Sequence, residues 1–442
     1  MSRTLTEWLA HIEQVHPKSI DMGLDRVRVV AARMALARPA PVVITVGGTN
    51  GKGSTVAFIE SIARQSRRRV GVYTSPHLLA FNERIRIDGV DAGDAAIVDA
   101  FEAIDVARLH GDPVALTYFE YATLAALWLF ARAALDLVVL EVGLGGRLDA
   151  TNLVDPDVAV ITTVDLDHQD YLGVDREAIG FEKAGIARAW QPLVLGDDDP
   201  PSSVLRHAYA IGAACIRANC DFFFSLREID ADTDSDSDVD PIASLQPAVS
   251  AWTWRDVGHA MTLPLPALLA PVQLRNAAVA IAALRATSLD IDDAAIARGV
   301  ANARLRGRLQ RVDRDGISVL LDVAHNPQAA RALAAWLEAS PIEGHTRAVF
   351  AALGDKDVRG VVEALAPHID HWHLAGLAGP RAIDAETLAA RLGGTPAASA
   401  TRHADVDAAL AHALAASRPG DRVLVFGSFH TVADAMRVLE AP

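Results

Sequence analysis

Cysteine is scarce in this chain, where only Cys215 and Cys220 occur among 442 residues. Two cysteines can supply neither a disulfide framework nor a cysteine metal site, and such scarcity is typical of proteins of the reducing cytoplasm. Positive charge is also in deficit, because the formal net charge is −15. Nonspecific binding to nucleic acid is therefore not expected, and anionic ligands must be bound by local groups and not by the overall field.

Long apolar runs are absent too. No run is long enough to span a bilayer, and residues 1–8 are polar and lack the apolar core of a signal peptide. We therefore expect a cytoplasmic protein without membrane association. The 51% hydrophobic and 22% charged residues are the balance of an ordinary globular protein, and a chain of this length is expected to form two or three domains.

The most informative segment is an apolar, β-branched run, Val42–Val46, that stops at a Gly-rich turn with one lysine. The turn reads Gly47-Gly48-Thr49-Asn50-Gly51-Lys52-Gly53-Ser54-Thr55, and a helix-like segment follows over residues 56–61. Backbone N–H groups and a helix N-terminus would converge at this turn, which suits phosphate. In P-loops the lysine reaches the β- and γ-phosphates and a hydroxyl faces Mg²⁺, which makes Lys52 and either Ser54 or Thr55 candidates.

The turn departs from the standard P-loop at two places. Val46 stands where the first Gly is expected, and Gly53 stands where Ser or Thr is expected directly after the lysine. A purely structural Gly-rich turn is therefore the alternative to a nucleotide phosphate site.

Three apolar runs predict buried strands at residues 42–46, 137–142 and 157–163. Helical patterns separate them, and the stretch 124–134 is rich in Ala and Leu without Gly or Pro, which predicts a buried helix. Strands that alternate with helices favour a parallel sheet covered on both faces. Such sheets bind ligands at the carboxyl ends of their strands.

Polar residues follow the ends of two of these strands. Glu141 ends the second strand, and an acid at that place in a P-loop domain typically holds Mg²⁺ directly or through water. Three glycines and Arg147 come next. Either the glycines let the backbone approach a ligand closely and Arg147 pairs with its phosphate or carboxylate, or the segment is a plain turn with an exposed arginine. Asp165, Asp167 and His168 follow the third strand. Because Mg²⁺ prefers oxygen donors, His168 is either a ligand or a structural histidine.

Two other segments admit more than one interpretation. Residues 117–121 hold three aromatics and an acid, which either cap the following helix or line a pocket. Residues 229–240 alternate Asp with other residues, but the Gly and the distal Glu of an EF-hand are missing. We expect an exposed acidic loop there and not a calcium site.

The later part of the chain repeats the strand–helix alternation without a second P-loop. Strands are predicted at residues 317–321, 347–353 and 422–426, and a helix at residues 328–338. This pattern indicates a second, smaller α/β unit, hinged near residues 302–310.

A strand-to-helix transition in the second unit carries two candidate site residues. Asp322 and His325 precede a helix that begins at Asn326-Pro327, with Pro at the first helical position. We expect both side chains to face a crevice between the two units. Arg308, on the hinge, is expected to reach a nucleotide held by the first unit.

Taken together, these segments resemble one family closely, the folylpolyglutamate synthases of the Mur ligase superfamily, and especially the bacterial bifunctional members of that family. In chain order, the motifs that carry the resemblance are Ile20-Asp21-Met22-Gly23-Leu24, Gly48-Thr49-Asn50-Gly51-Lys52-Gly53-Ser54, Ser75-Pro76-His77-Leu78, Thr117-Tyr118-Phe119-Glu120, residues 141–152, Glu182-Lys183-Ala184-Gly185-Ile186, Asp322-Val323-Ala324-His325-Asn326-Pro327, Gly354-Asp355-Lys356-Asp357 and Gly427-Ser428-Phe429. Each motif is weak alone, but in this order they are highly specific and span nearly the whole chain. One departure is Arg306, where relatives often have Pro before the hinge Gly-Arg pair, and the acidic segment 229–240 also looks peculiar to this chain.

The resemblance implies an α/β fold with two domains. Residues 1–300 would form an ATP- and folate-binding, P-loop ATPase-type parallel-sheet domain. Residues 301–442 would form a smaller, Rossmann-like α/β domain, the glutamate ligase domain.

The resemblance also implies roles for individual residues. The implied ATP contacts are Asn50, Gly51, Lys52, Gly53, Ser54, Asn276, Arg308, Asp322 and His325. The implied Mg²⁺ ligands are Ser75, Glu141, His168 and Lys183, of which Lys183 would be carbamylated and bind a second ion. The implied folate contacts are Ile20, Asp21, Met22, Thr117, Tyr118, Phe119, Glu120, Leu148, Asp149 and Ala150. Lys52, Lys183 and His168 are the implied catalytic residues.

The implied reaction joins L-glutamate to dihydropteroate, forming dihydrofolate, and to tetrahydrofolate or other reduced folates, forming folylpolyglutamates. ATP would convert the carboxylate to an acyl phosphate, which the glutamate amine attacks, while two Mg²⁺ ions and Lys52 stabilise the transferring phosphoryl group. The second domain would close to exclude water. A monomer is expected, since the family is typically monomeric.

Two other functions compete with this one. A Mur ligase acting on a nucleotide-linked cell-wall precursor usually carries an N-terminal domain for the UDP sugar, for which a P-loop near residue 47 leaves no room. A guanine-nucleotide switch needs an Asn-Lys-x-Asp motif to read the base, and the sequence contains none.

Overall fold

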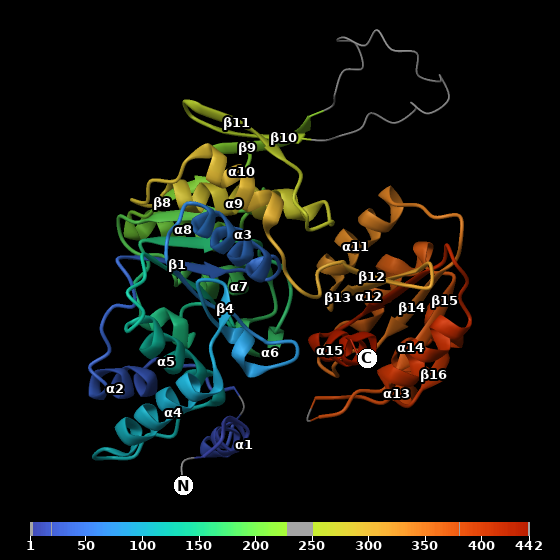
Figure 1. Ribbon diagram of the computed structural model, residues 1–442, viewed down its shortest axis with the longest axis horizontal. Coiled ribbons are helices and arrows are strands. Elements are labelled where there is room, and N and C mark those ends of the chain that lie inside the picture. Colours follow the sequence, from blue (N-terminus) through green and yellow to red (C-terminus); the bar gives the residue numbers. More distant parts are fainter. Residues whose placement is uncertain (1–2, 19, 228–250, 380, 441–442) are drawn as a thin grey trace.

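The structure is a computed structural model that describes residues 3–18, 20–227, 251–379 and 381–440. Within these residues the chain forms three sheets. Figure 1 shows them as a first α/β lobe on the left, a second α/β lobe on the right, and a small sheet at the top of the first. The acidic segment 229–240 lies outside the described residues, so its interpretation as an exposed loop stays a prediction.

An eight-stranded sheet forms the centre of the first lobe, with strand order β4-β3-β2-β5-β1-β6-β7-β8. Its strands are β1 Val42–Gly47, β2 Val70–Tyr73, β3 Ile85–Ile87, β4 Val90–Asp91, β5 Leu137–Glu141, β6 Val158–Ile161, β7 Pro192–Leu195 and β8 Ala214–Arg217. The strands from β2 to β8 in this order run parallel, and β3 and β4 add an antiparallel edge. The predicted parallel sheet is confirmed, and its antiparallel edge was not predicted.

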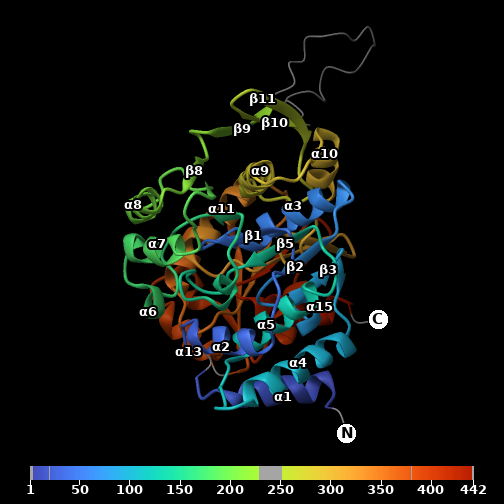
Figure 2. The same cartoon turned by 90° about the vertical axis from the view of Figure 1, so that its left-hand side faces the viewer.

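Helices cover both faces of this sheet, as Figure 2 shows from the side. They are α1 Leu5–Val15, α2 Asp25–Arg33, α3 Lys52–Gln65, α4 Asp94–Leu109, α5 Tyr118–Phe130, α6 Gln169–Leu172, α7 Arg176–Ala184, α8 Ser202–Ile211, α9 Val272–Arg285 and α10 Asp293–Asn302. The side chains of β1 alternate between two cores, since Ile44 and Val46 pack with α3 and α9, whereas Val43 packs with α4 and α5. This alternation is what a strand buried on both faces requires.

The Ala/Leu-rich helix predicted at residues 124–134 is present, but its predicted ends are wrong. It begins at Tyr118 because Thr117 and Glu120 form a capping box, in which each side chain accepts a hydrogen bond from the other's backbone N–H. It ends at Phe130, and Ala134 has a left-handed backbone with φ 48°. The cap interpretation of residues 117–121 is therefore correct.

A three-stranded antiparallel sheet in the first lobe was not predicted. It consists of β9 Phe222–Arg227, β10 Ala251–Asp256 and β11 His259–Pro264. Trp252 and Trp254 alternate along β10 and are buried in the core that this sheet shares with α9. The indole N–H of Trp254 donates to the carbonyl of Ala278 on α9, at 3.1 Å. The small sheet thus covers the outer side of the helix that carries Asn276.

The second lobe holds a six-stranded sheet with strand order β12-β13-β17-β14-β15-β16. Its strands are β12 Gln310–Arg314, β13 Ile317–Asp322, β14 Thr346–Phe350, β15 His371–Ala375, β16 Thr401–His403 and β17 Arg422–Phe426. Its helices are α11 Pro327–Ala339, α12 Val358–Leu365, α13 Ala385–Arg391, α14 Val406–Ala415 and α15 Phe429–Glu440. β12 is an antiparallel edge and the other strands are parallel. The second α/β unit is therefore confirmed, although β14 ends at Phe350 and not at residue 353.

One irregular linker joins the lobes. α10 ends at Asn302 and β12 begins at Gln310, so the linker falls within the predicted hinge.

In the part of the chain that the structure describes, no helix combines the length and the apolar character needed to cross a membrane.

Candidate active site

The Gly-rich turn connects the end of β1 to the start of α3. Gly48 and Gly51 both have positive φ, 144° and 87°. A Cβ at Gly48 would lie 1.9 Å from the Thr162 hydroxyl, and one at Gly51 would lie 2.6 Å from the side-chain oxygen of Asn276. These two positions require glycine for backbone conformation and for space. The resulting turn presents the N-terminus of α3 to the space above the sheet, as a phosphate site requires.

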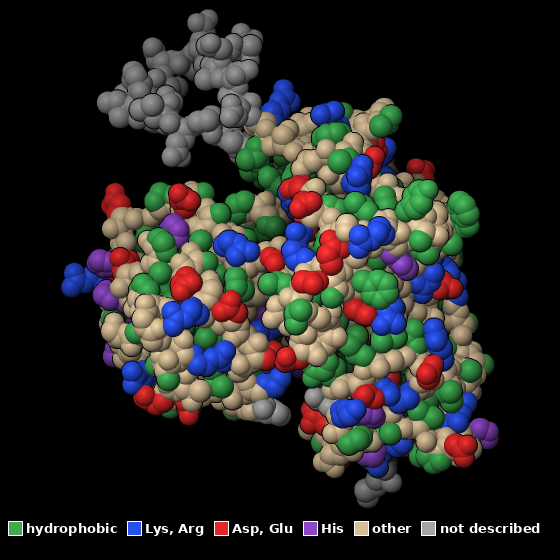
Figure 3. Space-filling model, turned by 180° about the vertical axis from the view of Figure 1, so that it is seen from behind, with side chains coloured by type: hydrophobic (Ala, Val, Ile, Leu, Met, Phe, Trp, Pro, Cys, Tyr) green, Lys and Arg blue, Asp and Glu red, His purple; other side chains and the backbone are tan. Residues whose placement is uncertain are grey.

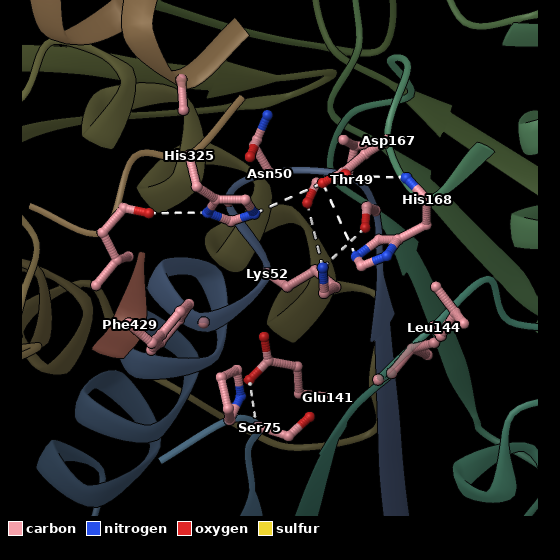
Figure 4. A pocket seen from close by; sticks show the side chains of 18 of the residues that line it. Thr49, Asn50, Lys52, Ser75, Glu141, Leu144, Asp167, His168, His325 and Phe429 are labelled. Atoms are coloured by element: carbon pink, nitrogen blue, oxygen red, sulfur yellow. Dashed lines mark hydrogen bonds and ion pairs between the residues drawn. The ribbon is translucent and has the colours of Figure 1, made fainter. Parts of the chain in front are cut away.

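Lys52 is the first residue of α3 and is enclosed by the turn. Its ammonium donates to the backbone carbonyls of Gly48 and Thr49, at 2.9 and 3.2 Å. Burial lowers the pKa of Lys52, and the nearby Glu141 carboxylate opposes that shift. Figure 4 shows Lys52 between Glu141 on one side and Asp167 with His168 on the other. The amine therefore lies at the centre of the site, where a phosphate would meet it.

Glu141 ends β5, the strand next to β1. Its carboxylate accepts the backbone N–H of Ser75 at 3.2 Å, and the side chain is 5% exposed. Burial raises the pKa of Glu141, while the charge of Lys52 opposes that shift. A further cation placed beside this carboxylate would therefore favour its ionised form.

The sequence offers the hydroxyls of Ser54 and Thr55 as alternatives for the group that faces Mg²⁺. Ser54 lines the cavity described below, and Thr55 does not.

His168 follows β6 with a left-handed backbone, φ 51°. Burial lowers its pKa to about 4, although the Asp167 carboxylate opposes that shift. The imidazole is therefore neutral near pH 7 and has a nitrogen lone pair to offer a ligand.

Lys183 lies near the end of α7 and is 4% exposed. Burial and the charge of Lys52 lower its pKa to about 7. About half of such amines are neutral at pH 7, so the nitrogen is available as a nucleophile. Lys183 is therefore buried, although a Glu-Lys pair taken alone is more often found on a protein surface.

The second lobe contributes the opposite wall of the site. Asp322 accepts the backbone N–H groups of Leu309 and Ala324 at 2.9 and 2.8 Å, and burial raises its pKa. The Arg308 guanidinium lies 5.4 Å from the centre of the Phe429 ring. An adenine or ribose between these walls would meet a carboxylate, a guanidinium and an aromatic face.

Asp167 connects the two lobes. Its carboxylate forms an ion pair with Lys356 of the second lobe at 2.7 Å and lies 3.6 Å from the His325 imidazole. Burial opposes ionisation of Asp167, but the His325 imidazole and the Lys356 ammonium beside the carboxylate hold its pKa well below the usual range. Figure 4 shows the contact between Asp167 and His325 beside the P-loop.

The segments implied for the folate lie together on the remaining wall. Arg26 joins two of them, since its guanidinium donates to Asp21 at 2.5 Å and to Glu120 at 3.2 Å. The Phe119 and Tyr73 rings lie 5.9 Å apart, and Asp149 accepts the backbone N–H of Leu144 at 2.9 Å. Helix α5 thus both begins at its cap and lines a pocket.

One cavity of about 940 Å³ joins all of these walls. The sequence-derived candidates that line it are Ile20, Asp21, Met22, Asn50, Gly51, Lys52, Gly53, Ser54, Ser75, Thr117, Tyr118, Phe119, Glu120, Glu141, Leu148, Asp149, Ala150, His168, Lys183, Asn276, Arg308, Asp322 and His325. Figure 3 shows from behind the furrow between the two lobes, with acidic and basic side chains along it. The geometry therefore brings the whole candidate set together, while the role of each residue stays a prediction.

Several wall residues carry no role in the sequence interpretation. Lys356 and Gln328 bind first-lobe side chains, and Arg84 donates to the His77 imidazole at 2.8 Å on the cavity wall. Lys356 follows β14 at its carboxyl end, so the rule that ligand sites lie at strand ends was a usable signal. No comparable signal marks Gln328, which lies in the first turn of α11 and not directly after a strand.

Two family models match the chain, one in each lobe. The Mur ligase middle domain matches residues 46–284. The glutamate ligase domain of the Mur ligases matches residues 307–429.

Curated relatives match at nearly full length. The dihydrofolate synthase/folylpolyglutamate synthase of Escherichia coli is 45% identical over 438 residues, which are 99% of this chain and 96% of that protein. The protein of the same name from Haemophilus influenzae is 41% identical and covers 99% of this chain and 98% of its own length.

Solved structures match the fold as well. Escherichia coli FolC in complex with DHPP and ADP has a TM-score of 0.89 and 44% identity, covering 99% of this chain and 98% of that one. A bifunctional folylpolyglutamate synthase/dihydrofolate synthase with Mn, AMPPNP and L-glutamate bound has a TM-score of 0.88 and 43% identity, covering 100% of this chain and 99% of that one. This chain belongs to the Mur ligase family and is an ATP-dependent ligase.

Proposed function

We propose that this ligase adds L-glutamate to dihydropteroate, forming dihydrofolate, and to reduced folates, forming folylpolyglutamates. The observation that carries the proposal is the single cavity, because it joins the P-loop turn to the three segments implied for the folate. The relatives named above carry the two synthase activities in their names, and the solved relatives hold DHPP, ATP analogues, ADP or L-glutamate.

The nucleotide would lie between the two lobes. Residues 50–54 would hold its phosphates, with Lys52 turning from the carbonyls of Gly48 and Thr49 to the β- and γ-phosphates. Asn276, Arg308, Asp322 and His325 would contact the rest of ATP. Arg308 supports this assignment because it is buried next to an aromatic ring and an acid, where a bound anion would offset its charge.

The residues present fit Mg²⁺. Among the described residues, no three His, Cys, Asp or Glu side chains are grouped to hold a metal ion by themselves. The proposed ligands Ser75, Glu141, His168 and Lys183 include only two residues of those types, so hydroxyl, modified lysine and substrate oxygens must complete the coordination. When bound, two Mg²⁺ ions would supply positive charge that stabilises the transferring phosphoryl group.

Lys183 is proposed to act as a carbamate. Its neutral amine, favoured by a pKa of about 7, would form an N–C bond with CO₂ and release a proton. The product carries a negative charge and two oxygen donors in place of a buried cation, which suits a hard cation. The charge of Lys52, which opposes protonation of Lys183, would stabilise the carbamate anion.

The chemical steps follow from this arrangement. An oxygen of the substrate carboxylate attacks the γ-phosphorus, the bond to the β-bridging oxygen breaks, and ADP leaves. The glutamate amine then attacks the carbonyl carbon of the acyl phosphate, loses a proton, and phosphate leaves from the tetrahedral intermediate. Lys52 would hold the phosphoryl oxygens, and the second lobe would exclude water that hydrolyses the acyl phosphate.

The direct test offers dihydropteroate and tetrahydrofolate separately, each with ATP, Mg²⁺ and L-glutamate, and identifies products by mass. The proposal predicts a mass gain of one glutamate residue on dihydropteroate and of one or more on tetrahydrofolate. ATP hydrolysis that does not depend on both the folate substrate and glutamate would contradict it.

We further propose a domain division near residues 300 and 301, within two residues of the end of α10, together with a cytoplasmic location and a monomeric state. The family matches at 46–284 and 307–429 fall on either side of that boundary. Cys215 and Cys220 are both free, which is compatible with a reducing compartment. Analytical ultracentrifugation tests the monomer.

A further inference from the structure

Asn326 is the N-cap residue of α11 in the second lobe. Its side-chain oxygen accepts the backbone N–H of Ala329 at 2.9 Å, which is the usual capping bond. The side chain is only 4% exposed, yet a cap alone does not require burial. The other hydrogen-bonding groups of this carboxamide bind side chains of the first lobe.

Asn326 and Asn50 form a reciprocal amide pair across the lobes. The Asn50 amide donates to the Asn326 oxygen at 3.1 Å, and the Asn326 amide donates to the Asn50 oxygen at 3.0 Å. The Asn50 amide also donates to Gln328 in the first turn of α11. Because Asn50 directly precedes Gly51 and Lys52 in the P-loop, α11 contacts the phosphate-binding turn itself.

The same Asn326 amide reaches a third partner. It donates to the Asp167 carboxylate at 3.4 Å, next to His168. One side chain therefore connects the P-loop, the end of β6 and the N-terminus of α11. All of its donors and acceptors serve these contacts, which is how buried polar networks fix one arrangement.

We propose that Asn326 is a positioning residue that fixes the second lobe on the P-loop, and so sets where Asp322, His325 and Arg308 stand relative to the ATP phosphates. Asp322 and His325 precede Asn326 in the same turn, which is held by the bonds from Ala324 to Asp322 and between His325 and Val323. Displacement of Asn326 therefore displaces both residues. This inference rests on the proposed ligase function and assigns the closure of that site to one carboxamide.

The substitution Asn326→Ser separates the two roles of the residue. Serine caps helices as well as asparagine does, so the bond to Ala329 is retained. The serine hydroxyl is too short to reach both Asn50 and Asp167. Asn326→Asp is the second variant, because aspartate also caps but lacks the amide donor and sets a carboxylate against Asp167.

The expected result is a change in catalysis without a matching loss of stability. For Asn326→Ser we expect a melting temperature within a few degrees of wild type, a 10- to 100-fold lower kcat, and more than one phosphate released per amide bond. The excess phosphate arises because water reaches the acyl phosphate in a loosely closed site. A wild-type kcat and a ratio of one phosphate per bond in both variants would overturn the proposal.

The control is Asp384→Ser at the cap of α13, whose carboxylate accepts the backbone N–H of Thr387 at 2.7 Å. Asp384 does not line the cavity, so this variant should keep wild-type kcat and stoichiometry. If it changes them as Asn326→Ser does, a general effect of serine at a helix cap and not lobe positioning explains the result, and the proposal falls.

A binding measurement separates this proposal from the proposed reaction. AMP-PNP affinity is measured by calorimetry for wild type, Asn50→Ala, Asn326→Ser and the double variant, without any folate. Substitutions of two coupled residues should have non-additive effects on AMP-PNP affinity. The double variant should therefore bind AMP-PNP at least fivefold more tightly than the product of the two single effects predicts. Additive effects would overturn the positioning role even if ligation is established, whereas non-additive effects would uphold it even if another acceptor is found.

Discussion

Two groups of buried charges in the cavity differ in how the protein satisfies them. The ligand-facing charges are Lys52, Glu141 and Lys183, and the bridging charges are Asp167 and Lys356. The bridging charges neutralise one another, with an ion pair at 2.7 Å between side chains that are 7% and 11% exposed. Lys52 and Glu141 bind only backbone groups in the hydrogen bonds of the described residues.

This difference shows which buried charges are left for bound ligands to compensate. Burial shifts the pKa of each ligand-facing group in the direction that favours its neutral form. Bound phosphates would compensate the positive charge, bound cations would compensate the negative charge, and CO₂ would react with the neutral amine of Lys183. The bridging charges need no ligand, and they hold the lobes together. Substitutions in the first group should therefore harm activity, and substitutions in the second should harm stability.

Lys52→Ala should have the largest effect on activity. It removes the cation at the centre of the phosphate site, so we expect ligation to fall by at least about 1,000-fold, the size of effect that loss of preorganised charge stabilisation produces. The melting temperature should stay within a few degrees, because within the described residues the hydrogen bonds of this cation go to the backbone carbonyls of Gly48 and Thr49. Radiolabelled glutamate incorporation measures the first and calorimetry the second. Near-normal turnover would remove Lys52 from the ligand-facing group.

Lys183→Ala should lose about 100-fold or more of activity, since loss even of a residue that only orients a metal ligand typically costs about 10- to 100-fold. Short carboxylic acids such as acetate should restore part of it, because they can replace the carbamate oxygens. Lys52→Ala provides the control, since acetate should not rescue it. Full activity without any added acid would refute a carbamate at Lys183.

The pH dependence of the same lysine has a defined sign. A pKa lowered to about 7 means that the amine is neutral above pH 7 and protonated below it. Incorporation of ¹³CO₂ at constant CO₂ pressure should therefore decrease as the pH falls from 8 to 6. Carbon-13 NMR detects the carbamate carbon, and the signal should be missing in Lys183→Ala. A signal independent of pH would contradict the lowered pKa.

Asp167→Asn should have the largest effect on stability. It leaves the buried Lys356 ammonium with the more distant Asp355 carboxylate, at 3.9 Å, as its counter-ion, and breaking a buried pair costs about 3 kcal/mol. Urea unfolding measures the loss, and Asp167→Asn combined with Lys356→Met should recover much of it, because the uncompensated charge is gone. If the single variant is as stable as wild type, the bridging group does not hold the lobes together.

Arg306→Ala should have the smallest effect. Its ion pair with Glu440 is at the surface, since the two side chains are 42% and 52% exposed. Such pairs contribute about 0–1 kcal/mol, so stability and kcat should both stay close to wild type. A large loss of kcat would show that Arg306, at the hinge position where relatives often have Pro, contributes to catalysis beyond its surface ion pair with Glu440.

Local signals in the sequence predicted the parts of the fold that local physics decides. Alternation of strands and helices predicted both parallel sheets, and the Gly-rich segment predicted a turn between a strand and a helix, because φ at Gly48 and Gly51 depends on nearby residues. The hairpin of β10 and β11 was missed although Trp252 and Trp254 alternate and Gly258 has φ 86° at the turn.

The lobe contacts could not be predicted in the same way. Asp167 and Lys356 are 189 residues apart in the chain, and Asn50 and Asn326 are 276 apart. Each is polar and follows or precedes a regular element, which is equally typical of an exposed residue. Likewise, only tertiary burial distinguishes Lys183 from an ordinary surface lysine.

The most direct test of the central claim follows one oxygen atom. Dihydropteroate labelled with ¹⁸O in its carboxylate is converted with ATP and L-glutamate, and the released phosphate is examined by mass spectrometry or ³¹P NMR. An acyl phosphate requires one ¹⁸O to pass from the carboxylate to each phosphate. One label per phosphate is the predicted result, and unlabelled phosphate formed together with new amide product would contradict activation of the carboxylate by ATP.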